Sequence, residues 1–248
     1  MLFFITLTVA GILAGALNAI AGGGTFLTFP ALVWLGLPPI MANATATIGA
    51  LPGYASSAWG YRADVGAEGA LGLRAIIGLG ALGGLLGAGL LLVTPGAVFD
   101  GLVPWLLLIA TLLFAAGPRI LNFVRARGIG PAGPVLSGAA VLAVSTYGGY
   151  FNGGLGILLL AMLGLIGFVN LHGMNGLKVL LSAVLSLVSA VAYAAAGLID
   201  WRAALIMAVA TTIGGYLGAR GAKLIRMDHL RIGITGVGLV MTVLFFAL

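Results

Sequence analysis

The sequence has no cysteine and very few charged residues. Eleven lysines and arginines and five aspartates and glutamates make up 6% of its 248 residues, whereas about a quarter of the residues in a typical soluble domain are charged. So few charges cannot cover the water-facing surface of a chain of 24.8 kDa. The absence of cysteine also excludes disulfides, thiolate nucleophiles and metal sites that need cysteine ligands.

Motifs for enzymatic chemistry are missing as well. The sequence has no His-Glu-x-x-His, no Gly-x-Ser-x-Gly and no Gly-x-x-x-x-Gly-Lys-Ser/Thr loop for ATP, and its carboxylates are not clustered. We therefore expect neither an enzyme nor a bound cofactor or metal ion. The net charge of +6 comes from basic residues in short loops between apolar segments. That placement is typical of topology signals and not of a nucleic-acid surface.

What the sequence has in abundance is apolar residues and glycine. Hydrophobic residues make up 62% of the chain, and 42 glycines are spread through the apolar runs. Residues 1–5 lack the basic region that opens a signal peptide, so we expect them to begin a retained membrane segment. A helix needs about 20 mainly apolar residues to span a bilayer. We predict an all-α polytopic membrane protein with continuous spans at residues 42–61, 75–93, 102–117, 174–196, 203–219 and 232–248.

Two further apolar regions are interrupted by glycine-rich breaks. Residues 3–36 contain the run Gly22-Gly23-Gly24, and residues 134–168 contain a longer break between Gly148 and Gly156. Each region is long enough for two half-helices joined by a loop. This pattern predicts a re-entrant helical hairpin in each region, which enters the membrane and leaves on the same side.

The two halves of the chain resemble each other at a nearly constant offset. The stretch 83–88 recurs as 214–219, and Asn43 and Asn175 lie 132 positions apart. Several such matches in the same order indicate an internal duplication, which is the recurrent plan of secondary transporters. We predict a first repeat at residues 1–117, a basic linker at 118–133 and a second repeat at 134–248.

The basic residues distinguish two possible topologies. If both interrupted regions are re-entrant, the loops at 62–74, 118–133 and 220–231 share one side of the membrane and carry nine lysines and arginines. If each interrupted region is instead a single span, the basic residues divide between the two sides without a useful bias. The positive-inside rule favours the first topology. It predicts an inner (plasma) membrane protein with cytoplasmic basic loops, extracytoplasmic termini and inverted repeats of three spans each.

The glycine-rich breaks are the candidate substrate site. Non-helical backbone at membrane depth is tolerated only inside protein or beside a wet cavity. A half-helix that begins at such a break presents free N–H groups and a positive dipole end, which suit an anion. We expect Thr25 to open one half-helix and Leu155 to open the other. The alternative is that the glycines only permit tight helix packing, as Gly11 and Gly15 are expected to do.

Polar residues at helical spacing follow each hairpin. Asn43 and Thr47 are four residues apart and share a helix face. Lys178, three residues after Asn175, is the only cation within a predicted span. It either serves an anionic substrate or extends its side chain to the nearby cytoplasmic surface. The candidate substrate-binding residues are Asn18, Gly22, Gly23, Gly24, Thr25, Asn43, Thr47, Tyr150, Asn152, Gly153, Gly154, Asn175 and Lys178.

These residues resemble the TauE/SafE sulfite-exporter family. The resemblance lies in residues 11–36, with the Gly22–Gly24 run before Phe29-Pro30-Ala31-Leu32, and continues through residues 36–47. Residues 148–178 look like a shorter echo, although the aromatic-asparagine insertion at 150–152 departs from the expected glycine pattern and leaves the substrate open. The resemblance implies paired re-entrant hairpins and transport, usually export, of sulfite, organosulfonates or thiosulfate.

The sequence therefore favours a secondary transporter of small sulfur-containing anions that works by alternating access. The expected partners are the anionic substrate and the lipid bilayer, without nucleic acid. A proton or a sodium ion could be the coupling ion, and the sequence leaves that choice open. The alternatives are a passive anion channel and a transporter of another small anion.

Overall fold

The chain is helical wherever its structure is described. The computed structural model describes residues 1–20, 22–126, 133–221 and 227–247, and these form ten α-helices without a β-strand. The predicted linker and the loop at 220–231 fall partly outside the described residues. The helices are α1 (Leu2–Ile20), α2 (Thr25–Trp34), α3 (Pro39–Gly60), α4 (Leu73–Val93), α5 (Gly96–Ala126), α6 (Pro134–Tyr150), α7 (Leu155–Leu165), α8 (Leu171–Ala195), α9 (Trp201–Gly221) and α10 (Met227–Ala247).

Five of these helices are long and apolar enough to cross a membrane by length and composition: Leu2–Ile20, Leu73–Val93, Gly96–Gly117, Leu171–Ala195 and Trp201–Arg220. Each of the six predicted spans coincides with a helix, but two of these helices lie outside this group. In α10 the described apolar stretch is only Thr235–Ala247, and α3 is too polar. Its Asn43, Thr45 and Thr47 are all buried against other helices. At 1.5 Å per residue, the 19-residue α1 is about 28 Å long, and it ends directly before the predicted break.

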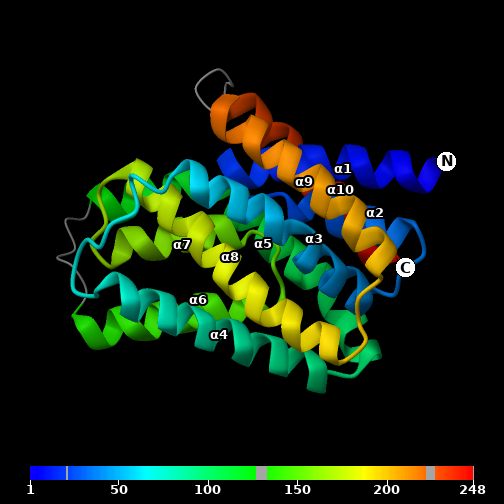
Figure 1. Ribbon diagram of the computed structural model, residues 1–248, viewed down its shortest axis with the longest axis horizontal. Coiled ribbons are helices and arrows are strands. Elements are labelled where there is room, and N and C mark those ends of the chain that lie inside the picture. The colour runs from blue at the N-terminus through cyan, green and yellow to red at the C-terminus, as the bar shows by residue number, and fades with distance from the viewer. Residues whose placement is uncertain (21, 127–132, 222–226, 248) are drawn as a thin grey trace.

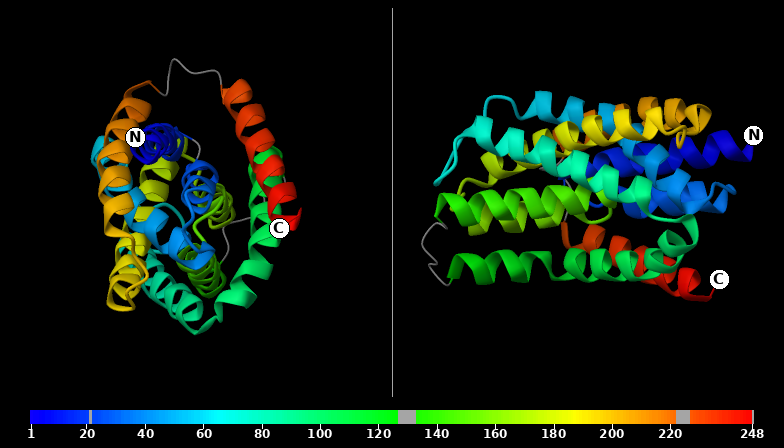
Figure 2. Two further views of the ribbon diagram at one scale, coloured as in Figure 1. Left: turned by 90° about the vertical axis from the view of Figure 1, so that its right-hand side faces the viewer. Right: turned by 90° about the horizontal axis from the view of Figure 1, so that it is seen from below.

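The first two helices form a pair that turns back on itself. The N-terminus, the far end of α2 and the C-terminus lie together at one end of the long axis (Figures 1 and 2). The helices α6 and α7 form a second pair that begins and ends at the opposite end. The two turns therefore meet near the middle of the molecule, where the short helices α2 and α7 lie in the interior (Figure 2).

Close packing joins the two halves of the sequence. Helix α9 of the second half lies along α1 and α3 of the first, and α4 of the first half lies along α6 and α8 of the second. Glycines permit this approach: a Cβ at Gly15 would lie 2.8 Å from the Gly215 nitrogen, and one at Gly87 would lie 2.6 Å from the Tyr150 nitrogen. Small residues let helix backbones come this near.

Candidate functional site

The two glycine-rich breaks touch at the centre of the molecule. A Cβ added to Gly22 would lie 2.5 Å from the Gly156 Cα, and a Cβ added to Gly156 would lie 2.5 Å from the Gly22 Cα. Gly22 has φ +82° and Gly154 has φ +68°, a left-handed backbone that glycine adopts without strain. The breaks at positions 22–24 and 151–154 thus form one site with backbone in direct contact.

Two helices begin at this contact. Helix α2 begins at Thr25 and α7 begins at Leu155, which confirms the predicted starts. The first N–H groups of a helix lack acceptors within the helix, and they carry its positive dipole end. The Asn18 side chain takes one donor, because its Oδ1 accepts a hydrogen bond from the Gly24 N–H at 2.8 Å. Two electropositive helix ends therefore converge in the protein interior.

Asn152 links three helices at the contact. Its backbone carbonyl accepts a hydrogen bond from Thr25 Oγ1 in α2 at 3.3 Å, its Oδ1 accepts one from Tyr54 OH in α3 at 3.3 Å, and its Nδ2 donates to Ser186 Oγ in α8 at 3.5 Å. Only 3% of Asn152 is exposed. This residue ties the second break to both halves of the chain.

Side-chain hydrogen bonds satisfy carbonyls at the end of α6 and in the break after it, two of them from other helices and one from Tyr147 of α6 itself. Asn43 Nδ2 donates to the Tyr150 carbonyl at 2.9 Å, Tyr147 OH donates to the Gly153 carbonyl at 2.7 Å, and Tyr193 OH donates to the Gly149 carbonyl. Asn43 Oδ1 is buried without a hydrogen-bond partner in the described structure. The Thr47 hydroxyl donates to the Asn43 carbonyl one turn earlier on α3 at 2.9 Å.

Lys178 and Asn175 lie apart from the contact. Lys178 is 1% exposed, so its side chain does not extend to the surface. Its Nζ donates to Asn175 Oδ1 at 3.1 Å, and no carboxylate of a described residue forms an ion pair with it. Lys178 precedes Ser186 by eight positions on α8, which is about 12 Å along the helix axis. Of the predicted set, these two residues form a separate pair, with Lys178 buried and Asn175 half-buried.

Several contributing residues were not predicted. Tyr54 and Ser186 hold the two ends of the Asn152 amide, and a Cβ at Gly23 would meet the Phe114 ring at 2.7 Å. Positions 54 and 186 are 132 apart, the same offset that relates Asn43 to Asn175, so the duplication contained a signal for both. Within the described residues, no three His, Asp or Glu side chains gather where they could hold a metal ion.

Comparison with known proteins places these features in a family. The family model described as "Sulfite exporter TauE/SafE" matches residues 7–245. The relatives are described as probable membrane transporter proteins. One from Sinorhizobium, named ORF9, is 29% identical over 89% of this chain and 85% of its own; one from Haemophilus influenzae is 31% identical over 85% and 81%. YfcA of Escherichia coli K12 is 30% identical over 91% of this chain and 83% of its own. No solved structure matches.

Proposed function

We propose that this chain, which belongs to the TauE/SafE sulfite exporter family, carries small sulfur-containing anions such as sulfite or organosulfonates. It is a multi-pass membrane protein, as expected for a member of that transporter family. The observation that carries the proposal is the contact between Gly22 and Gly156, which brings the N-termini of α2 and α7 together. Two positive helix ends that face each other repel, and an anion between them removes the repulsion. Oxyanions of sulfur have the negative charge and the acceptor oxygens that such a site needs.

The proposed topology is two inverted repeats, residues 1–117 and 134–248, each with a re-entrant hairpin and three spans. The linker at 118–133 is cytoplasmic in the inner membrane, and both termini are extracytoplasmic. Three features support it. The pairs α1–α2 and α6–α7 open towards opposite ends of the molecule (Figure 2). Helix α9 packs on α1 as α4 packs on α6. In this topology most of the lysines and arginines lie on one side of the membrane.

The proposed mechanism is alternating access around the hairpin contact. The proposed resting state is occluded, which is supported by the burial of Asn18, Thr25, Asn43 and Asn152, each no more than 5% exposed. A simple rocking of one sequence half against the other would separate α1 from α9 and α4 from α6. We infer instead that each hairpin moves with the helix that packs along it, so that the site opens where the hairpins part.

In this mechanism Lys178 attracts the anion on its way between the cytoplasm and the contact. A buried ammonium without a carboxylate partner is costly, so its retention suits a charge-compensating ligand. We expect Lys178→Met to raise the apparent KM for the anion about tenfold, which corresponds to about 1.4 kcal/mol. The variant should be as stable as the parent or more stable, because it removes an unpaired buried charge. Substrate-concentration series in proteoliposomes and thermal unfolding would measure both effects. An unchanged KM in a folded variant would remove Lys178 from the proposed path.

Flux measurements with the purified protein in liposomes test the proposal directly. We expect saturable uptake of sulfite or sulfoacetate, little uptake of chloride, and faster uptake when the same anion is present on the other side. This trans-stimulation separates a carrier from a passive channel, in which the far side does not accelerate entry. Empty liposomes are the control. Absence of any saturable sulfur-anion flux, with flux of another solute, would contradict the proposed substrate.

A further inference from the structure

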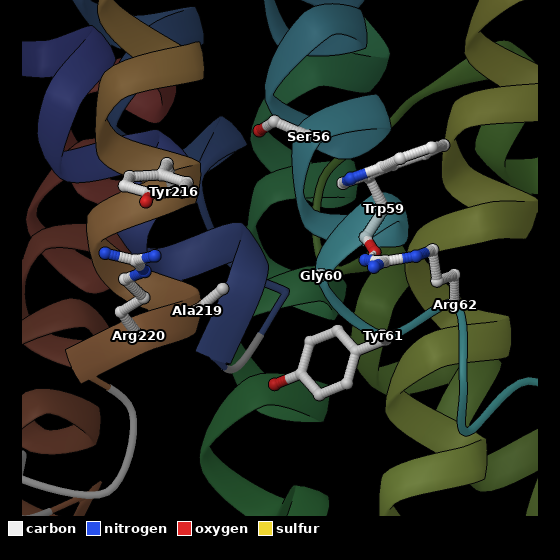
Figure 3. Close-up of a pocket in the computed structure, with 8 residues that line it drawn as sticks. All are labelled: Ser56, Trp59, Gly60, Tyr61, Arg62, Tyr216, Ala219 and Arg220. Carbon is white, nitrogen blue, oxygen red and sulfur yellow. Dashed lines mark hydrogen bonds between the residues drawn. The ribbon is translucent and has the colours of Figure 1, made fainter.

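A cavity lies at the end of the molecule where α3 and α9 finish. Its volume is about 340 Å³, and its lining includes Ser56, Trp59, Tyr61, Arg62, Tyr216 and Arg220 (Figure 3). None of the described residues that line it carries a carboxylate. These residues supply two cationic side chains and three aromatic rings. It lies away from the hairpin contact and has no part in the proposed transport step.

Both arginines are held in place by aromatic rings. The Arg62 guanidinium carbon lies 4.7 Å from the centre of the Trp59 ring, and that of Arg220 lies 4.5 Å from the centre of the Tyr216 ring. Arg62 also donates a hydrogen bond from Nη1 to the Trp59 carbonyl at 2.8 Å. Stacking on a ring fixes the plane of a guanidinium and leaves N–H donors at its edge. The two side chains flank the cavity from α9 and from the end of α3 (Figure 3).

The surroundings of the cavity are those of a membrane interface. Trp59 is 71% exposed and Tyr216 is 48% exposed, and such aromatic residues favour the headgroup level of a bilayer. On α9 the apolar side chains Ile213 and Leu217 are exposed beside Tyr216. An occupant can therefore place an anionic group between the arginines and an apolar chain along α9. Those are the two parts of an anionic phospholipid.

We propose that this cavity binds the phosphate group of an anionic phospholipid, with Arg62 and Arg220 on either side of the phosphate oxygens. Guanidinium groups suit phosphate because their N–H donors match pairs of its oxygens. The part of the lining that the structure describes has no carboxylate, which disfavours headgroups with a cationic end, such as phosphatidylcholine. The site thus selects by net headgroup charge.

Trp59 provides a fluorescent probe inside the cavity. The chain has four tryptophans, so Trp34→Phe, Trp105→Phe and Trp201→Phe in the full-length protein leave Trp59 alone. Phosphatidylglycerol with brominated acyl chains, titrated into the protein in detergent, should quench Trp59 at about tenfold lower concentration than brominated phosphatidylcholine. We expect Arg62→Gln or Arg220→Gln to weaken phosphatidylglycerol binding about fivefold each and the double variant to weaken it roughly 25-fold.

The matched control is Arg202→Gln. Arg202 also stacks on aromatic rings, at 5.2 Å from Phe3 and 5.1 Å from Phe4, but it does not line the cavity. This variant should leave Trp59 quenching unchanged. Equal quenching by the two lipids, or full binding by a folded double variant, would overturn the proposal. Displacement of the lipid by millimolar inorganic phosphate would also overturn it, because the site would then serve a soluble anion.

Discussion

Gly156→Ala should reduce anion flux at least about tenfold, because the added methyl group has no room at the hairpin contact. The new Cβ would lie 2.5 Å from the Gly22 Cα and 3.1 Å from the Gly22 oxygen, both of them backbone atoms that cannot rotate away. Overpacking of this kind costs about 1–3 kcal/mol. The two hairpins must separate slightly to accept it, which moves the N-termini of α2 and α7 apart. Flux in proteoliposomes, corrected for the amount of inserted protein, measures the effect.

Two further variants test the same contact, one as a reciprocal substitution and one as a control. Gly22→Ala makes the reciprocal contact at 2.5 Å and also forces a side chain into φ +82°, which adds about 1 kcal/mol or more, so its flux should fall further. Gly78→Ala in α4 is the control, because a Cβ there meets nothing within 4 Å. It should transport normally and unfold at the same or a slightly higher temperature, since alanine favours helix. Normal flux in a Gly156→Ala protein would contradict a site at the contact.

Asn152→Leu should lower the free energy of unfolding by about 2–4 kcal/mol and remove most transport. Leucine has the same branched side-chain shape but leaves the hydroxyls of Tyr54 and Ser186 without the partners they have in Asn152. Each buried polar group that loses its partner costs about 1–3 kcal/mol. The backbone carbonyl of residue 152 still accepts from Thr25, so the break itself should persist. Thermal unfolding in detergent and flux at matched protein levels are the measurements.

A double-mutant cycle separates lost hydrogen bonds from general disruption. Tyr54→Phe alone should cost about 1 kcal/mol. In the Asn152→Leu background the same change should cost nothing or restore some stability, because the hydroxyl no longer has its acceptor. Additive costs would mean that Tyr54 and Asn152 contribute independently, and the hydrogen-bond network would then be the wrong explanation of any lost flux.

The helices and both breaks could be predicted from the sequence, because they depend on local features: the length of each apolar segment and the position of the glycine runs. Thr25 and Leu155 open their helices at the predicted positions, since a helix cannot continue easily through consecutive glycines. Helix α1 ends at Ile20, directly before the predicted break. Gly11 and Gly15 were expected to permit tight helix packing, and α9 packs directly on them.

The partners of the site residues depend on long-range packing and could not be predicted from local pattern. Asn152 was expected to face a substrate, yet its amide joins Tyr54 and Ser186, which are 98 and 34 positions away. Lys178 and Asn175 were grouped with the breaks because they follow the second one in sequence, whereas on α8 they lie about 12 Å and about 16 Å from Ser186 along the helix axis. The duplication offset relates Tyr54 to Ser186, so pairing equivalent positions would have recovered both.

The exchange of helices between the two halves also affects how the chain is made. Gly15 packs against Gly215, so the face of α1 that forms first during synthesis acquires its partner 200 residues later. Helix α4 likewise remains without α6 until the second half begins to appear. Contacts this distant in sequence form slowly. The growing chain therefore needs lipid or an insertion factor to cover α1 until α9 has been synthesised. The time between the synthesis of α1 and of α9 sets how long this face of α1 is exposed to quality control.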